Sequence, residues 1–318
     1  MEFFERFRSA LARYSQGVHR VGAPVDDVEL RVAEAALGHA LPLSLASFLR
    51  AWNGVELFHE EVVIAPARQI ARDPLDAERL AIGQLAGAPL VLDSRGRVLL
   101  IDEDTERAQV VGSQLGRFID AAMARGALLH DREGEFREGV FGPGEGVLVP
   151  RVRRRLADAG IKADPDAPAW HEELAYLFLD EEQPEPALRA LEKVVMLDER
   201  AADAWSMLAQ LRRAAGELDA ASEAFRSAAR VEPSVEEQAF ALAQALRCVP
   251  DPAIATAVLR LAPRFVDDAR RAAQHLIEEG DIDGARDRVE LAQAVTPDDA
   301  ELAQLAALLR ARGRLKQI

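Results

Sequence analysis

The sequence predicts two structural classes in one chain: an α+β domain with an antiparallel sheet and helices, followed by an all-α solenoid of helix pairs. In residues 151–318, small and large apolar residues recur about every 34 positions, and Pro165, Glu199 and Pro233 follow this spacing. Residues 1–130 instead combine helical apolar patterns with short runs that are typical of strands. This change of pattern predicts two domains.

Residues 131–150 are expected to form a linker between these domains. The segment is acidic and contains Gly142-Pro143-Gly144, a combination that is typical of loops. A glycine-rich phosphate-binding loop is the alternative, but no strand–turn–helix unit with a Lys or Ser/Thr follows. We therefore interpret the segment as a loop.

Three helices are predicted before the sheet. The first has apolar residues at helical spacing, namely Phe3, Phe7, Leu11 and Tyr14. The second starts after Asp26, which resembles a capping box with Glu29, and stops at Gly38. The third opens at Pro42 and stops at Asn53-Gly54.

The sheet is expected to be an antiparallel meander. The predicted strands are residues 59–64, 79–82, 89–93, 97–102 and 107–111. Ser94-Arg95-Gly96 and Glu103-Asp104-Thr105 supply the turns between the last three. Ser113 is expected to cap a closing helix that carries Leu115, Phe118, Ile119 and Met123.

The clearest helical repeat covers residues 202–235. Its marker residues are Trp205, Leu208, Ala209, Gly216, Ala221, Phe225, Ala228 and Pro233. The repeat at 236–265 is about four residues short, and Asp251-Pro252 is expected to start its second helix, because proline suits only a first turn. Residues 300–312 are interpreted as a capping helix, and residues 151–163 as the second helix of a degenerate repeat.

These repeats resemble the tetratricopeptide repeat family over about half of the chain. The resemblance implies that the first helix of each pair lines a concave face that holds a protein or peptide. The residues that would lie on it are Tyr176, Gln210, Arg213, Phe240, Gln244, Arg247, Arg270 and Gln274. Amides can bond an extended backbone and arginines can hold carboxylates, while an ordinary polar surface is the alternative. We expect Arg213 and Arg247 to be exposed.

The N-terminal half resembles the SUKH superfamily. Its opening motifs are Leu37-Gly38, Leu41-Pro42, Phe48-Leu49 and Trp52-Asn53-Gly54, and residues 81–83, 90–93, 102–106 and 118–119 follow the later ones. The family is known chiefly for bacterial immunity proteins that bind and neutralise protein toxins, and the resemblance implies such a role here. A second partner surface is predicted at Trp52, Asn53, Asp102, Glu103 and Asp104.

Composition narrows the class of function. The net charge of −15 disfavours binding to nucleic acid or to an anionic membrane and suits a basic protein partner. The single cysteine, Cys248, and the lack of a signal peptide predict a cytoplasmic protein. The six histidines are scattered, so we expect no catalytic residue, no metal site and no cofactor. The carboxylates near Asp102 could hold a hard cation, but a solvated turn is the simpler interpretation.

We therefore predict a protein-binding protein that is not an enzyme. The leading hypothesis is a bacterial immunity-type protein with a toxin partner, as in toxin–antitoxin pairs. The alternative is a repeat scaffold or regulatory adaptor without a toxin partner. An enzyme is the third hypothesis, which would require carboxylates or histidines to gather in a pocket. The sequence indicates neither the partner's identity nor an oligomeric state.

Overall fold

The computed structural model describes residues 2–102, 104–143 and 146–315. The chain divides into two compact units, Met1–Leu197 and Asp198–Ile318, and each is described by itself. The division comes later in the chain than the boundary expected near residue 150. The reason is that three helices after residue 149 pack in the same unit as the sheet.

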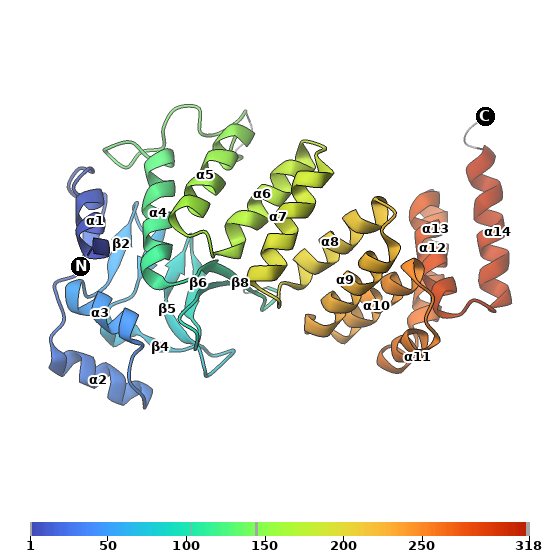
Figure 1. The fold of residues 1–318 in the computed structure, drawn as a ribbon, viewed down its shortest axis with the longest axis horizontal. Coiled ribbons are helices and arrows are strands. Elements are labelled where there is room, and N and C mark those ends of the chain that lie inside the picture. Colours follow the sequence, from blue (N-terminus) through green and yellow to red (C-terminus); the bar gives the residue numbers. More distant parts are fainter. Residues whose placement is uncertain (1, 103, 144–145, 316–318) are drawn as a thin grey trace. The chain divides into compact units, whose positions relative to one another are not determined.

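The first unit contains one antiparallel sheet, as predicted (Figure 1). In the described residues its strands are β1 (Arg20–Val21), β2 (Val55–Leu57), β3 (Val62–Ile64), β4 (Ala71–Arg72), β5 (Leu80–Leu85), β6 (Ala88–Leu92), β7 (Val98–Ile101) and β8 (Ala108–Gly112). The order is β1-β2-β3-β5-β6-β7-β8, and β4 also pairs with β5. Strands β1, β2 and β4 were not predicted because each has only two or three residues. The first half of the expected strand 59–64 is instead a turn.

The first unit also contains helices. They are α1 (Glu2–Leu11), α2 (Asp27–Leu37), α3 (Leu43–Ala51), the 3-10 helix η1 (Ala67–Gln69), α4 (Leu115–Leu129), α5 (Pro150–Ala163), α6 (Pro168–Asp180) and α7 (Pro184–Leu197). Asp26 caps α2 as predicted, since its side chain accepts from the backbone N–H groups of Val28 and Glu29. Gly38 ends α2 with φ of 76°, a left-handed conformation that favours glycine.

Ser113 does not cap α4, contrary to the sequence expectation. Its hydroxyl donates to Asp164 Oδ1 at 2.6 Å, and its backbone N–H donates to Asp164 Oδ2 at 2.7 Å. Asp164 follows α5 and is fully buried. The serine therefore links the start of α4 to the end of α5, which explains part of the late unit boundary.

The segment expected to be a linker is packed. His130 forms an isolated bridge with Phe136, and Phe141 forms another with Leu148. Val140 is buried in a cluster with Leu129, Val152 and Leu156, which belong to α4 and α5. These contacts tie residues 131–143 and 146–149 to the first unit.

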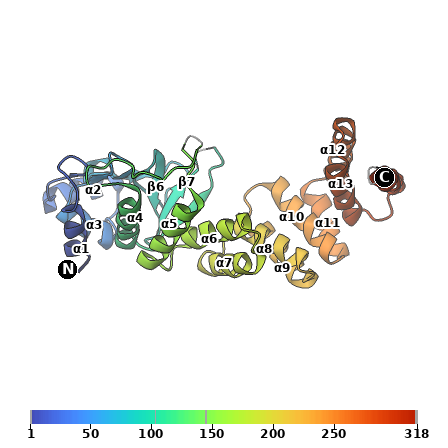
Figure 2. The same ribbon diagram turned by 90° about the horizontal axis from the view of Figure 1, so that it is seen from above.

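The second unit is built from helix pairs (Figure 2). Its helices are α8 (Ala202–Ala214), α9 (Leu218–Val231), α10 (Val235–Cys248), α11 (Pro252–Leu261), α12 (Phe265–Glu279), α13 (Ile282–Val295) and α14 (Ala300–Leu315). Residues 170–312, all of which the structure describes, contain no strand, as predicted. The fold class is therefore an α+β part followed by helix pairs typical of a repeat solenoid.

The pair α10–α11 is shortened where the sequence predicted. Helix α11 has 10 residues, whereas α9 and α13 each have 14. It begins at Pro252, and the Asp251 side chain accepts from the backbone N–H of Ala253. Helix α13 packs against both α10 and α11. In α14, Leu302 and Leu309 are fully buried, as a closing helix requires, but Leu308 is 46% exposed.

Candidate functional site

Two residues predicted for the repeat face lie side by side. Arg213 Nη1 of α8 donates to the side-chain oxygen of Gln244 on α10 at 2.8 Å. Arg247, also on α10, approaches the same oxygen at 3.4 Å. The first helices of two successive pairs, α8 and α10, are therefore linked by a side-chain hydrogen bond.

Gln244 and Arg247 are not exposed, which corrects the sequence expectation for Arg247. Gln244 is only 8% exposed, and the Arg247 side chain only 16%. Arg247 forms ion pairs with Asp287 at 2.5 Å and Glu290 at 2.8 Å, both on α13. These two residues hold α10 to α13, because a partly buried bidentate arginine is a strong structural link.

The other predicted residues of the second unit differ in their surroundings. Gln210 and Gln274 are exposed. Phe240 is half-buried and lies 5.6 Å from the Arg288 guanidinium. Arg270 pairs with Asp267 and Glu301. Polar groups that could meet a partner are thus Gln210, Gln274 and the half-buried Arg213.

Tyr176 belongs to α6, in the first unit, and is 37% exposed. Its predicted place in a ladder with Gln210 and Gln274 stays a prediction.

The prediction that Trp52 and Asn53 belong to a partner-binding surface is wrong for Trp52, which is buried. Trp52 is 7% exposed and packs against Phe4 at 5.3 Å and Phe7 at 4.9 Å between ring centroids. The Asn53 side-chain oxygen accepts from the Ala67 N–H at 2.7 Å. Both residues therefore stabilise the first unit, and the Trp-Asn-Gly motif is a core contact and a helix stop.

The acidic turn after β7 is a local structure. Asp102 Oδ1 accepts from the N–H groups of Asp104 and Thr105. These bonds, that to Thr105 foremost, lower the pKa of the Asp102 carboxyl below its usual value. Glu103 lies outside the described residues. Within the described part of the chain, no group of three His, Cys, Asp or Glu residues could hold a metal ion.

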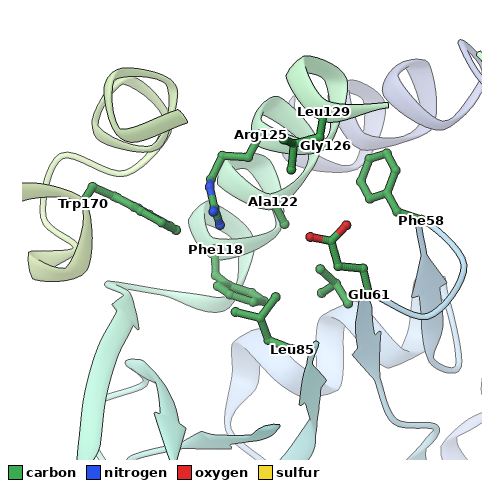
Figure 3. Close-up of a pocket in the computed structure, with 10 residues that line it drawn as sticks. Phe58, Glu61, Leu85, Phe118, Ala122, Arg125, Gly126, Leu129 and Trp170 are labelled. Carbon is green, nitrogen blue, oxygen red and sulfur yellow. The ribbon is translucent and has the colours of Figure 1, made fainter. Parts of the chain in front are cut away.

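A pocket that the sequence did not reveal lies in the first unit (Figure 3). It lies between α4, Trp170 of α6, and the turn that joins β2 to β3. Its polar residues are Arg125 and Glu61, and its apolar walls include Phe58, Phe118 and Leu85. Behind its opening it has room for roughly one water molecule. These residues come from distant parts of the chain, so no motif or spacing could have found the pocket.

Two helical glycines make room for the aromatic walls. A Cβ on Gly126 of α4 would stand 2.0 Å from the Phe58 ring. A Cβ on Gly160 of α5 would stand 2.5 Å from the Trp170 ring. Because carbon atoms in contact stay about 3.5 Å apart or more, only glycine permits these approaches.

The turn that carries Phe58 and precedes Glu61 has an unusual backbone. Phe58, His59 and Glu60 all have positive φ, at 51°, 54° and 74°. Each such residue costs on the order of 1 kcal/mol, and such strain gathers at functional sites. His19 supports the turn, because its Nδ1 accepts from the Phe58 N–H at 3.2 Å.

Burial affects the pKa and the hydrogen bonding of the polar groups at this pocket. Desolvation lowers the pKa of Arg125, opposed by Glu61 and Glu173, although arginine keeps its proton in proteins. Its guanidinium lies 4.5 Å from the Trp170 ring centroid, a cation–π contact. Within the described structure, Arg125 Nε and Trp170 Nε1 are buried donors that no acceptor meets. The Glu61 carboxylate lies 3.6 Å from His130 Nε2.

Comparisons with known proteins concern the helical part of the chain. No protein-family model and no curated protein matches the chain. Among solved structures it is similar to MamA, with 20% identity over 46% of this chain and 89% of MamA, at a TM-score of 0.32. YrrB, described as a TPR protein with an unusual peptide-binding site, shares 18% identity over 50% of this chain and 84% of its own, also at 0.32. PilF of Pseudomonas aeruginosa shares 19% over 51% and 76%, at the same TM-score.

With TM-scores this low, the proposed function depends on the chain's own residues. The resemblance of the N-terminal motifs to the SUKH superfamily stays a prediction. No helix in the described residues is long and apolar enough to cross a membrane.

Proposed function

We propose that this protein binds another protein or a peptide through the polar face of its helical unit, and that it is not an enzyme. The observation that supports the proposal is the hydrogen bond between Arg213 of α8 and Gln244 of α10, which links the first helices of two successive pairs through their side chains. Exposed Gln210 and Gln274 belong to the first helices of their pairs. Amide and guanidinium groups can bind an extended backbone and its carboxylates.

The experiment compares charge reversal at two arginines. Arg213→Glu should weaken a partner identified by affinity capture and mass spectrometry more than tenfold, or about 1.4 kcal/mol. Arg226→Glu on α9 is the matched control, because that arginine has a half-exposed side chain and pairs with Glu223 on the same helix. Titration calorimetry with the purified partner measures both. Equal affinities of the two variants for the partner would show that the partner does not bind at Arg213.

Arg247→Glu is unsuitable for this test because it would leave Asp287 and Glu290 beside a third carboxylate. Gln210→Ala with Gln274→Ala is a better second variant, since both side chains are exposed and their removal leaves the helix packing intact. A loss of affinity without a change in melting temperature would support binding at this face.

A finer proposal is that the partner is a basic protein toxin, which the chain neutralises in the cytoplasm. The net charge of −15 and the SUKH-like motifs support it. Co-expression with a captured toxin should then rescue growth. A captured partner without toxicity would favour the alternative of a scaffold or regulatory adaptor.

A further inference from the structure

Helix α2 is apolar on two opposite faces. Leu30, Ala33 and Leu37 are buried on its inner side. On the outer side, Val28 and Val32 lie one turn apart, and their exposed fractions are 61% and 58%. The outer face of a surface helix is ordinarily polar, and a helix that is apolar on both sides is usually covered on both. The outer face of α2 therefore has the composition of a contact surface.

The two valines belong to a continuous stripe along the helix. Ala35 follows Val28 and Val32 at helical spacing and is also exposed. In Figure 1, α2 lies at the lower edge of the first unit, beneath α3. Single apolar residues scattered over a surface are normal, whereas apolar residues that gather on one exposed face mark interaction sites. We call Val28, Val32 and Ala35 the α2 stripe.

The charges beside the α2 stripe indicate what covers it. Asp27 and Arg31 lie one turn apart along the same edge of the stripe. The Asp27 side chain is 73% exposed and uses one carboxylate oxygen, Oδ1, to accept from Arg50. Arg31 is exposed and forms no ion pair with another described residue. A negative and a positive group on one edge complement the same edge of an identical helix that runs in the opposite direction.

We propose that the α2 stripe is a dimerisation surface on which a second copy of this chain packs, with the two α2 helices antiparallel. A two-fold axis level with Leu30 places Val28 of each copy opposite Val32 of the other. Arg31 of each copy then lies within about 3 Å, along the helix axis, of Asp27 of the other copy. The same patch is used on both subunits, which is the form that two-fold interfaces take.

The size of the surface limits the strength of the dimer. Standard interfaces bury roughly 800 Å² on each partner, and α2, with 11 residues, supplies only one face of a short helix. The net charge of −15 on each copy adds repulsion, which physiological salt screens beyond about 8 Å. We therefore expect a reversible dimer with a dissociation constant of roughly 10–100 µM.

Sedimentation velocity of the full chain at physiological salt, from about 1 µM to about 500 µM, measures this dimer. The unmodified protein should shift reversibly from monomer to dimer as its concentration rises. Val32→Glu should weaken self-association at least tenfold, because it places a carboxylate from each copy in the apolar contact. Val235→Glu is the matched control and should leave self-association unchanged, since Val235 is an exposed valine of α10 in the second unit.

Exchange of charges tests whether the occupant is a second copy. Asp27→Arg and Arg31→Asp should each weaken self-association at least tenfold, because like charges then meet across the two-fold axis. An equimolar mixture of the two variants should dimerise at least tenfold more tightly than either alone, since a basic edge then faces an acidic one. Both positions are exposed, so circular dichroism should show an unchanged fold.

Three results would overturn the proposal. A monomer over the whole concentration range would leave the α2 stripe to a different partner. Equal dissociation constants for Val32→Glu and Val235→Glu would place self-association on another surface. A mixture of the charge variants that dimerises no more tightly than its components would contradict the antiparallel pairing. None of these results affects the function proposed for the polar face of the helical unit, because α2 belongs to the first unit.

Discussion

At the scale of single residues, His19 ties the stability of the first unit to pH. Burial first, and then the charges of His59 and His130, lower the pKa of His19 from 6.5 to about 4. Its Nδ1 accepts from the Phe58 N–H, so the neutral ring is the form that supports the turn. Between pH 6.5 and pH 4, His19 is protonated in the unfolded chain but stays neutral in the folded chain. Stability is therefore lost as the pH falls from 6.5 towards 4.

We expect His19 to account for about 1–2 kcal/mol of this loss, after allowance for its partial exposure. The measurement is urea unfolding at pH 7 and pH 4.5 for the unmodified protein and for His19→Asn. An asparagine oxygen can still accept from Phe58 but does not titrate in this range. Parallel loss of stability in both proteins would show that another group is responsible.

Asp164 is the second residue whose substitution should change the stability of the first unit. It is fully buried and accepts from both the hydroxyl and the N–H of Ser113. Asp164→Asn replaces one acceptor oxygen with a donor that would face Ser113, and should cost about 2 kcal/mol. Asp166→Asn is the control, because Asp166 pairs with Arg117 at a side-chain exposure of 56% and should cost under about 0.5 kcal/mol. If chemical unfolding shows similar losses of stability for Asp164→Asn and Asp166→Asn, a structural role for Asp164 is contradicted.

At the scale of helices and strands, local sequence signals predicted where helices begin and end. Tertiary contacts determined which side chains are buried, and the sequence signals did not predict these. Asp26, Gly38 and Pro252 act within one turn of chain, and each lies at the helix end that it predicted. Trp52 was misplaced because a motif shows which residues occur together but not which side faces the core. Arg247 was expected to be exposed because its carboxylate partners lie 40 or more residues away on α13. The pocket at Arg125 depends entirely on such distant contacts.

The close packing of α4 against Phe58 predicts opposite effects on stability for alanine at two glycines of this helix, Gly126 and Gly116. Gly126→Ala should destabilise the protein by about 1–3 kcal/mol, because the new Cβ would overlap the Phe58 ring and force it to move. Gly116→Ala on α4 would place its Cβ 3.6 Å from Phe3, an ordinary contact. It should instead stabilise the helix by about 0.5–1 kcal/mol. Thermal unfolding of both variants checks the prediction, and shifts of the same sign would contradict it.

At the scale of the whole molecule, the repeat pattern and the compact units divide the chain at different places. The helical pattern begins near residue 151, yet α5, α6 and α7 belong to the unit that contains the sheet. Ala121 of α4, which is fully buried, clusters with Ala167 and Trp170, and Trp170 also covers Arg125. The sequence period shows which helices form pairs, but it does not show which neighbour completes a core.

This difference leads to a prediction about shortened chains. A fragment of residues 1–197 should unfold cooperatively in urea, because it keeps Asp164 and Trp170. A fragment of residues 1–150 should be less stable by at least about 3 kcal/mol, since it loses the bonds to Ser113 and exposes Ala121 and the apolar wall of the pocket. Residues 198–318 should fold alone as helix pairs, because α8–α14 have core clusters of their own. Equal urea midpoints for the 1–150 and 1–197 fragments would instead place the boundary near residue 150, where the change of sequence pattern lies.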